Sequence, residues 1–192
     1  MERIDRIVGG LPVGKTSIVY GPLGSLKTYL CLAAVKTFTS RGGVAYYIDT
    51  ELKTPQERVA PAVYVEAADV GRLLDTLLDV SRKVRYVSPL LVVVDSISAV
   101  MHPLVVSHPD YAKEKMRSLA YVVKRLNSEA VTILCVSWQL RGYHGRYLDP
   151  ALVMRTEKAA DGLRVVVERC EDMPTPFEEV VPVEEVLRVA LA

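Results

Sequence analysis

Two segments near the N-terminus have the spacing of a phosphate-binding loop, GxxxxGK[ST]. Residues 9–16 (GGLPVGKT) match it in full, whereas residues 21–28 (GPLGSLKT) have Leu26 in place of the second glycine. Such a loop must follow a buried strand and open a helix, because backbone N–H groups and the helix N-terminus have to converge on the phosphates. The neighbouring segments therefore decide between the two candidates.

The order of segments favours the second loop. Residues 9–16 follow the charged MERIDRIV and precede the β-rich SIVY, which indicates a turn that leads into a strand. Residues 21–28 follow SIVY and open an apolar, helix-like segment. We therefore expect ATP at the second loop, with these candidate contacts: Gly21, Gly24, Ser25, Lys27, Thr28 and Tyr29.

Leu26 is the one departure of this loop from the pattern. Glycine there would let the backbone approach phosphate and would permit a positive φ. A leucine forced into left-handed geometry costs about 1–2 kcal/mol, which could weaken binding about ten- to thirtyfold. We expect weakened nucleotide binding and hydrolysis rather than their loss.

Polar residues follow three further apolar runs. Asp95 ends LLVVV, the arrangement in which a carboxylate holds Mg²⁺ beside a phosphate loop, and Thr28 would give the hydroxyl ligand. Glu51, just after VAYYI, could polarise water for attack on the γ-phosphate; the alternative is a capping Asp followed by a solvated Glu. Gln139 follows ILCVS and could sense the γ-phosphate, while the sole tryptophan, Trp138, is expected to pack.

The elements that must position these residues alternate between strand and helix. A continuous apolar run such as LLVVV is typical of a parallel strand buried on both faces. Strands are predicted at residues 17–20, 44–48, 63–65, 90–94 and 131–136, and helices at 27–38, 55–59, 69–84 and 110–127.

The C-terminal part follows a different pattern. Residues 163–167 and 177–183 alternate and indicate an antiparallel edge pair, whereas residues 141–161 are polar without a clear period and 184–192 are ambiguous. The predicted fold class is α/β, a mostly parallel central sheet flanked by helices with a C-terminal antiparallel hairpin. In such folds the ligand lies beyond the carboxyl ends of the strands.

Length and composition are those of one domain over residues 1–192. Hydrophobic residues make up 50% of the sequence, which excludes an intrinsically disordered chain. The net charge of +1 argues against a protein that binds nucleic acid over its whole surface. The lack of a long apolar stretch and three isolated cysteines predict a cytoplasmic protein with no membrane contact. One Asn and two Gln are typical of a thermophile.

Four segments together resemble the RecA/RadA recombinase superfamily, specifically the ATPase core of an archaeal RadA or a shorter, RadB-like paralogue. The resemblance covers about residues 4–170 and rests on the joint order and spacing of the segments. They are IDRIVGGLPVGKTSIVYGPLGSLKT, YYIDTELKTPQERV, LLVVVDSISAV and ILCVSWQ.

The resemblance implies a RecA-like P-loop NTPase core with ATP and Mg²⁺ as cofactors, and a role for each matching residue. Lys27 would bind the β- and γ-phosphates, and Thr28 and Asp95 would hold the metal. Glu51 would activate water. Arg58, in the PER position, would stack on adenine, and Gln139 would couple the γ-phosphate to the loop that follows.

That following loop, about residues 140–160, falls where the family contacts single-stranded DNA. Basic residues interleaved with aromatics suit a phosphate track with base stacking, and the alternative is a solvated loop. The family's other DNA loop would fall at residues 101–113, which carry little positive charge. The candidate DNA contacts are Arg141, Tyr143, Arg146, Tyr147, Arg155 and Lys158.

The chain begins almost at the ATPase core, so the family's N-terminal DNA-binding domain and polymerisation segment are expected to be absent. The resemblance therefore implies a RadA paralogue that binds ATP, hydrolyses it weakly and assists recombination or DNA repair on single-stranded DNA, with a RadA-type recombinase or other paralogues as partners. Two alternatives remain: a pseudo-ATPase module that docks on a recombinase, and a KaiC-like signalling ATPase without a DNA role.

Overall fold

One eight-stranded sheet organises the computed structural model, which describes residues 3–84, 89–139, 143–160, 162–171 and 175–192. Its strands are β1 (Thr16–Tyr20), β2 (Val44–Asp49), β3 (Val63–Glu66), β4 (Leu90–Asp95), β5 (Thr132–Ser137), β6 (Leu152–Lys158), β7 (Leu163–Cys170) and β8 (Phe177–Val181). The strand order is β3-β2-β4-β5-β1-β6-β7-β8. Neighbours from β3 to β6 are parallel, whereas β7 pairs antiparallel with both β6 and β8.

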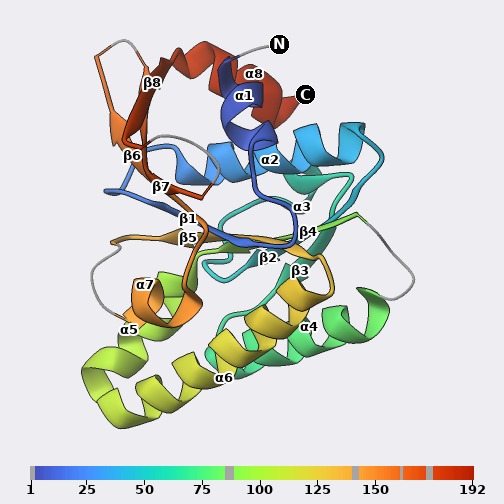
Figure 1. The fold of residues 1–192 in the computed structure, drawn as a ribbon, viewed down its shortest axis with the longest axis vertical. Coiled ribbons are helices and arrows are strands. Elements are labelled where there is room, and N and C mark those ends of the chain that lie inside the picture. The colour runs from blue at the N-terminus through green and yellow to red at the C-terminus, as the bar shows by residue number, and fades with distance from the viewer. Residues whose placement is uncertain (1–2, 85–88, 140–142, 161, 172–174) are drawn as a thin grey trace.

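Helices cover both faces of this sheet. They are α1 (Arg3–Gly9), α2 (Lys27–Ser40), α3 (Gln56–Val59), α4 (Val70–Lys83), α5 (Ile97–Ser107), α6 (Pro109–Ser128), α7 (Tyr143–Leu148) and α8 (Val183–Leu191). Figure 1 shows α1, α2 and α8 on one face and α4, α5, α6 and α7 on the other, with both chain ends beside α1 and α8.

β4 shows why this arrangement needs uniformly apolar strands. Leu91 and Val93 belong to the core cluster beneath α2, whereas Leu90, Val92 and Val94 belong to the cluster beneath α4 and α6. Every residue of the strand is buried, as the run LLVVV predicted. The predicted α/β class, with a mostly parallel sheet and antiparallel C-terminal strands, is confirmed.

Some expectations about loops were wrong. The polar segment at residues 141–161 contains α7 and β6, and β6 pairs in parallel with β1. Residues 101–109, part of the second DNA loop that the resemblance implied, belong almost entirely to α5 and α6, whereas the helix predicted at 110–127 is confirmed by α6. The ambiguous end forms α8. The residues of β6 gave only a weak indication of a strand. Leu152, Met154 and Thr156 are buried, whereas the charged Arg155 between them is half-buried.

Strand register brings the carboxyl ends of four parallel strands to one edge of the sheet. Asp49 pairs with Asp95, and Tyr20 pairs with Ser137. In Figure 1 strands β1 and β5 run from right to left, so this edge lies at the left. The residues that the sequence singled out for chemistry therefore meet there.

Candidate nucleotide-binding site

The loop from β1 to α2 has a backbone that strongly favours glycine. A Cβ on Gly21 would lie 2.2 Å from the backbone oxygen of Thr156, so a side chain there would collide with β6. Gly24 has φ 75°, and Leu26 has φ 57° and ψ 23°. The expectation that Leu26 occupies a position suited to glycine is confirmed. The left-handed backbone of this leucine costs about 1–2 kcal/mol.

Lys27 opens α2, and its side chain folds back over its own loop. Nζ donates to the backbone oxygens of Gly21 at 2.8 Å and Pro22 at 2.6 Å, and to Ser25 Oγ at 3.3 Å. Burial lowers the pKa of Lys27, while the nearby carboxylates of Asp95 and Glu51 oppose this shift. The ammonium group is thus held where phosphate oxygens could replace the loop carbonyls as acceptors.

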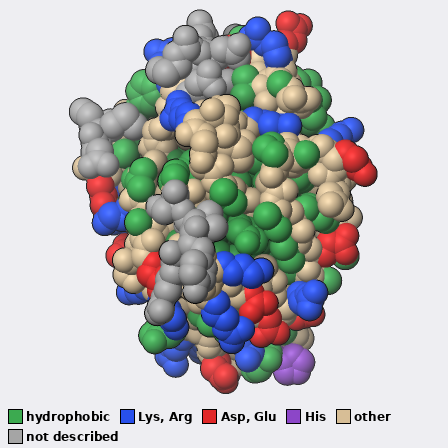
Figure 2. All heavy atoms as spheres, turned by 90° about the vertical axis from the view of Figure 1, so that its right-hand side faces the viewer, with side chains coloured by type: hydrophobic (Ala, Val, Ile, Leu, Met, Phe, Trp, Pro, Cys, Tyr) green, Lys and Arg blue, Asp and Glu red, His purple; other side chains and the backbone are tan. Residues whose placement is uncertain are grey.

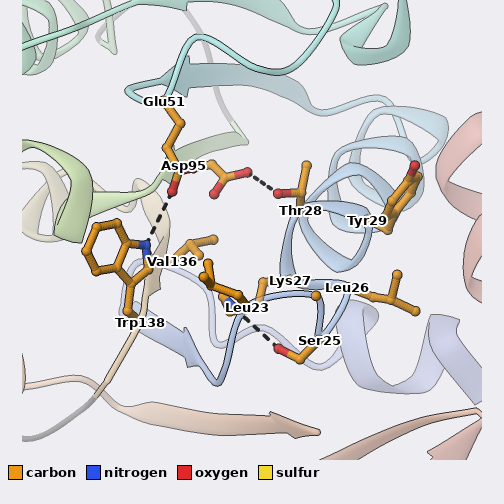
Figure 3. Close-up of a pocket in the computed structure, with 11 residues that line it drawn as sticks. Leu23, Ser25, Leu26, Lys27, Thr28, Tyr29, Glu51, Asp95, Val136 and Trp138 are labelled. Atoms are coloured by element: carbon orange, nitrogen blue, oxygen red, sulfur yellow. Dashed lines mark hydrogen bonds between the residues drawn. The ribbon is translucent and has the colours of Figure 1, made fainter. Parts of the chain in front are cut away.

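Asp95, at the end of β4, accepts two hydrogen bonds on one carboxylate oxygen. Thr28 Oγ1 donates to Oδ2 at 2.8 Å, and the Tyr47 hydroxyl donates to it at 2.6 Å (Figure 3 shows the first). Burial raises the pKa of Asp95, although both hydrogen bonds act against that rise. Tyr47 carries no sequence signal for this role, because within its strand it is one more apolar core residue.

Thr28 and Asp95, the predicted metal ligands, fit a magnesium site. Mg²⁺ is usually bound through one or two carboxylates, waters and substrate phosphates rather than by an all-protein cage. One hydroxyl and one carboxylate, 2.8 Å apart, supply that kind of partial donor set. Over the part of the chain that the structure describes, no group of three His, Cys, Asp or Glu side chains offers an all-protein site.

Glu51 lies in the same pocket, and both of its oxygens are hydrogen-bonded. Oε1 accepts from Ser96 Oγ at 2.9 Å and Trp138 Nε1 at 3.3 Å, and Oε2 accepts from Lys53 Nζ at 2.9 Å. Partial burial raises the pKa of Glu51, but these hydrogen bonds outweigh it and lower the pKa overall. The carboxylate is therefore charged at neutral pH, the form that a general base requires.

Asp49 caps the turn that carries Glu51. Its carboxylate accepts hydrogen bonds from four successive backbone N–H groups and from one hydroxyl: those of Glu51, Leu52, Lys53, Thr54 and Tyr64. The capping alternative was therefore right for Asp49, whereas Glu51 is hydrogen-bonded rather than simply solvated.

Two cavities of about 210 and 250 Å³ adjoin at the start of α2 and share four lining residues: Thr28, Tyr29, Glu51 and Asp95. The first is also lined by the phosphate loop and Trp138 (Figure 3), and the second by Arg58. Each alone is smaller than the roughly 300–1,000 Å³ of small-molecule sites. The phosphate loop and the predicted adenine contact thus face adjoining space at the start of α2.

At the end of β5, Trp138 rather than Gln139 faces this space. Trp138 lines the first cavity, and its indole nitrogen bonds Glu51, so it does more than pack. Gln139 is exposed and is not among the residues that line either cavity. Its coupling role stays a prediction.

The two predicted DNA contacts on β6, Arg155 and Lys158, differ in burial and in ion pairing. Arg155 is half-buried and forms ion pairs with Glu157 and with Glu168, whose Oε1 lies 2.9 Å from Arg155 Nε. Two carboxylates therefore compensate its charge locally, which argues against a free phosphate contact. Lys158, at the end of the same strand, is exposed.

The remaining DNA candidates lie in or before α7. Arg146 is exposed, whereas Tyr147 packs against the core cluster beneath α4 and α6. Tyr143 is the first residue of α7, and its side chain lies outside the described part, as does the whole of Arg141.

The first phosphate-loop match, residues 9–16, lies at the opposite edge of the sheet. It comprises the end of α1, a turn and the first residue of β1, as the order of segments predicted. Gly14 N donates to Thr132 Oγ1 at 3.2 Å, and Lys15 Nζ lies 3.7 Å from Glu171. Figure 2 shows the molecule from this side, with Lys, Arg, Asp and Glu side chains mixed along its lower part.

The described helices include none with the length and apolar character needed to cross a membrane. No protein-family model matches the chain. Similar proteins include the RecA proteins of Arthrospira platensis, 35% identical over 99 residues (48% of this chain, 27% of that protein), and Prochlorococcus marinus, 37% identical over 97 residues (47% and 26%). RecA of Clavibacter michiganensis is 35% identical over 100 residues (49% and 27%).

The matched region spans about a quarter of the length of these relatives. Homology over half of this chain supports the RecA-like recombinase superfamily, and the mostly parallel sheet with antiparallel C-terminal strands fits a RecA-like core. The relatives are bacterial, so they lend no support to an archaeal or thermophilic origin.

Proposed function

We propose that this chain binds Mg-ATP at the carboxyl edge of its sheet and hydrolyses it weakly. The observation that carries the proposal is the convergence of Lys27, the bonded pair Thr28 and Asp95, and Glu51 on the cavity at the start of α2. A cation, an oxygen donor set and an ionised carboxylate around one helix N-terminus are the parts that phosphoryl transfer to water needs.

Each residue has a distinct role in this proposal. Lys27 leaves its loop carbonyls for the β- and γ-phosphates, and Thr28 and Asp95 hold Mg²⁺, which neutralises charge on the phosphates when bound. Glu51 orients and deprotonates the attacking water. Arg58, beside the second cavity, stacks on the adenine.

We further propose, from the order and spacing of the four recombinase-like segments, a RadB-like paralogue of archaeal RadA. It would work in the cytoplasm with a RadA-type recombinase during homologous recombination and repair on single-stranded DNA. The exposed residues Arg146 and Lys158 are the described candidates for that DNA. The thermophilic habitat rests on the scarcity of Asn and Gln.

Calorimetry with Mg-ATP tests the nucleotide site. Lys27→Ala should weaken binding by about tenfold or more, because a hydrogen bond to a charged partner is worth about 1.5–3 kcal/mol. Lys15→Ala is the matched control: it removes the lysine of the first loop match and should bind like the wild type. Loss of binding with Lys15→Ala alone would contradict the site assignment.

The left-handed Leu26 favours a second candidate, the pseudo-ATPase module. Such a module would dock on a recombinase without turnover. Its signature would be capture of RadA-type recombinase that survives Lys27→Ala and needs no nucleotide, together with no ATP binding by the wild type.

A further inference from the structure

Trp138 connects the carboxylate of Glu51 to helix α5. Its indole Nε1 donates to Glu51 Oε1 at 3.3 Å. The ring of His102, on α5, packs against the indole with centroids 5.6 Å apart and a tilt of 54°. Figure 3 shows the indole nitrogen directed at Glu51 across the cavity.

Helix α5 also holds the backbone of Trp138. Trp138 N donates to Ser98 Oγ at 3.0 Å, and the hydroxyls of Ser98 and Ser137 lie 3.0 Å apart in a further hydrogen bond. Ser98 and His102 are four residues apart on a helix, which places them on one face. A single face of α5 thus fixes both the main chain and the ring of Trp138.

Two other donors, Lys53 and Ser96, also bond Glu51. Lys53 has a side chain that is 76% exposed, and an exposed ion pair of this kind is worth little. Ser96, buried beside Asp95 after β4, donates to the same oxygen as Trp138 at 2.9 Å, so these two donors together orient Oε1. Trp138 is the donor that reaches Glu51 from β5, on the far side of β4 from β2.

We propose that Trp138 is a positioning residue for Glu51: α5 fixes the indole, and the indole N–H fixes the carboxylate. The role of Glu51 in water activation rests on the proposed function, whereas the contact itself does not. Because Trp138 also lines the cavity, a bound nucleotide should alter the surroundings of the indole as well.

The sole tryptophan makes the contact directly measurable. In ¹⁵N-labelled protein the indole N–H gives a single NMR cross-peak. Glu51→Ala should move its proton resonance upfield, because a hydrogen bond to a carboxylate deshields the proton. Glu168→Ala, which removes a carboxylate bonded to Tyr20 and Arg155, is the control and should leave the peak in place. An unmoved peak in Glu51→Ala overturns the proposal.

Turnover tests the consequence of the contact. Trp138→Phe keeps an aromatic ring for His102 but removes the N–H, so ATP turnover should fall about tenfold, the scale of one hydrogen bond to a charged group. The dissociation constant for ATP should change less than turnover, because phenylalanine keeps a ring in the cavity while the lost N–H acts on Glu51. Wild-type turnover in Trp138→Phe overturns the proposal, as does a loss confined to affinity.

The two proposals fail in different ways. If the wild type neither binds nor hydrolyses ATP, the proposed function is wrong, and the NMR comparison, which needs no nucleotide, still decides the contact. If ATP is hydrolysed but Glu51→Ala leaves the indole peak unmoved, the proposed function stands and Trp138 is not the residue that holds Glu51.

Discussion

Leu26 occupies the N-cap of α2 with a backbone conformation that leucine rarely adopts. The fold holds it there: Leu30 N donates to Leu26 O at 3.0 Å, and the side chain packs against the core cluster beneath α2. A strain imposed by the fold is a cost to folding stability more than to ligand affinity. The weakening of ATP binding should therefore be smaller than the ten- to thirtyfold expected from the sequence.

Glycine and alanine at position 26 separate this backbone strain from packing. Both variants remove the same apolar side chain, but only glycine is free of the left-handed penalty. Leu26→Gly should therefore be more stable than Leu26→Ala by about 1 kcal/mol in urea unfolding. Equal stabilities would mean that the left-handed conformation is not retained.

Asp95 should lower the stability of the protein at neutral pH. Burial raises the pKa of Asp95 in the folded state above its value in the unfolded chain, so the folded protein takes up the proton first as pH falls. The loss of folding stability that the charged Asp95 causes therefore shrinks once the pH falls below the folded-state pKa. Asp95→Asn should unfold at higher urea than the wild type at pH 7, with the difference shrinking toward acid. One amide oxygen can still accept from both Thr28 and Tyr47, since both bond a single oxygen now. A difference that grows toward acid would contradict this assignment.

The spacing of charged and hydroxyl residues predicted part of the site. Lys27 and Thr28 follow from the loop pattern, and Asp95 follows from its place at the end of an apolar strand. Tyr47 and Ser96 could not be found in the same way, because a polar tip on a strand residue is visible only when the neighbouring strand is placed beside it. Trp138 was interpreted as a packing residue because nothing local to it indicates Glu51 as its partner.

At the scale of elements, β6 supports the phosphate loop. Thr156 Oγ1 lies 2.8 Å from Ser25 Oγ and 3.3 Å from the backbone oxygen of Tyr20, and its own backbone oxygen limits residue 21 to glycine. The loop is therefore shaped by a strand more than 100 positions further along the chain. Sequence patterns local to the loop carry no information about that support.

Replacing Thr156 by valine tests this support. Thr156→Val keeps the side-chain shape but removes the hydroxyl, so stability should fall by about 1 kcal/mol and ATP affinity should fall as well. Thr16→Val is the matched control: it removes a buried hydroxyl bonded to Asn127 at 2.8 Å, at the other end of β1. Urea unfolding should show a similar loss for both, and calorimetry should show weakened ATP binding only for Thr156→Val.

The elements differ in how clearly their residues predict them. β4 and β5 were found because uniform burial demands uniformly apolar residues. β6 was missed because three charged residues stand in its second half: Arg155 and Glu157 are half-buried, and Lys158 is exposed. α5 was missed because Pro103 lies inside it, where a proline normally argues against a helix.

For the molecule as a whole, a net charge near zero leaves nucleic-acid binding to local groups. Arg146→Glu combined with Lys158→Glu should weaken binding of single-stranded DNA and flatten its salt dependence, by about 0.7 in the log–log slope for each phosphate that the protein no longer neutralises. Arg155→Gln should leave both quantities unchanged, because Glu157 and Glu168 already compensate its charge. Fluorescence anisotropy with a labelled oligonucleotide at several salt concentrations measures the DNA affinity and its salt dependence. If Arg155→Gln weakens binding as much as the double variant does, the ion pairs leave Arg155 free to bind DNA.

The position of Trp138 also governs how the stability of this protein can be followed optically. The only tryptophan is 38% exposed beside the cavity rather than in either core cluster, so its emission reports the carboxyl edge of the sheet. Far-ultraviolet circular dichroism reports the helices on both faces instead. Unfolding curves from the two signals should coincide only if the pocket opens together with the cores, and an earlier emission change would reveal a pocket that opens while the sheet is still folded.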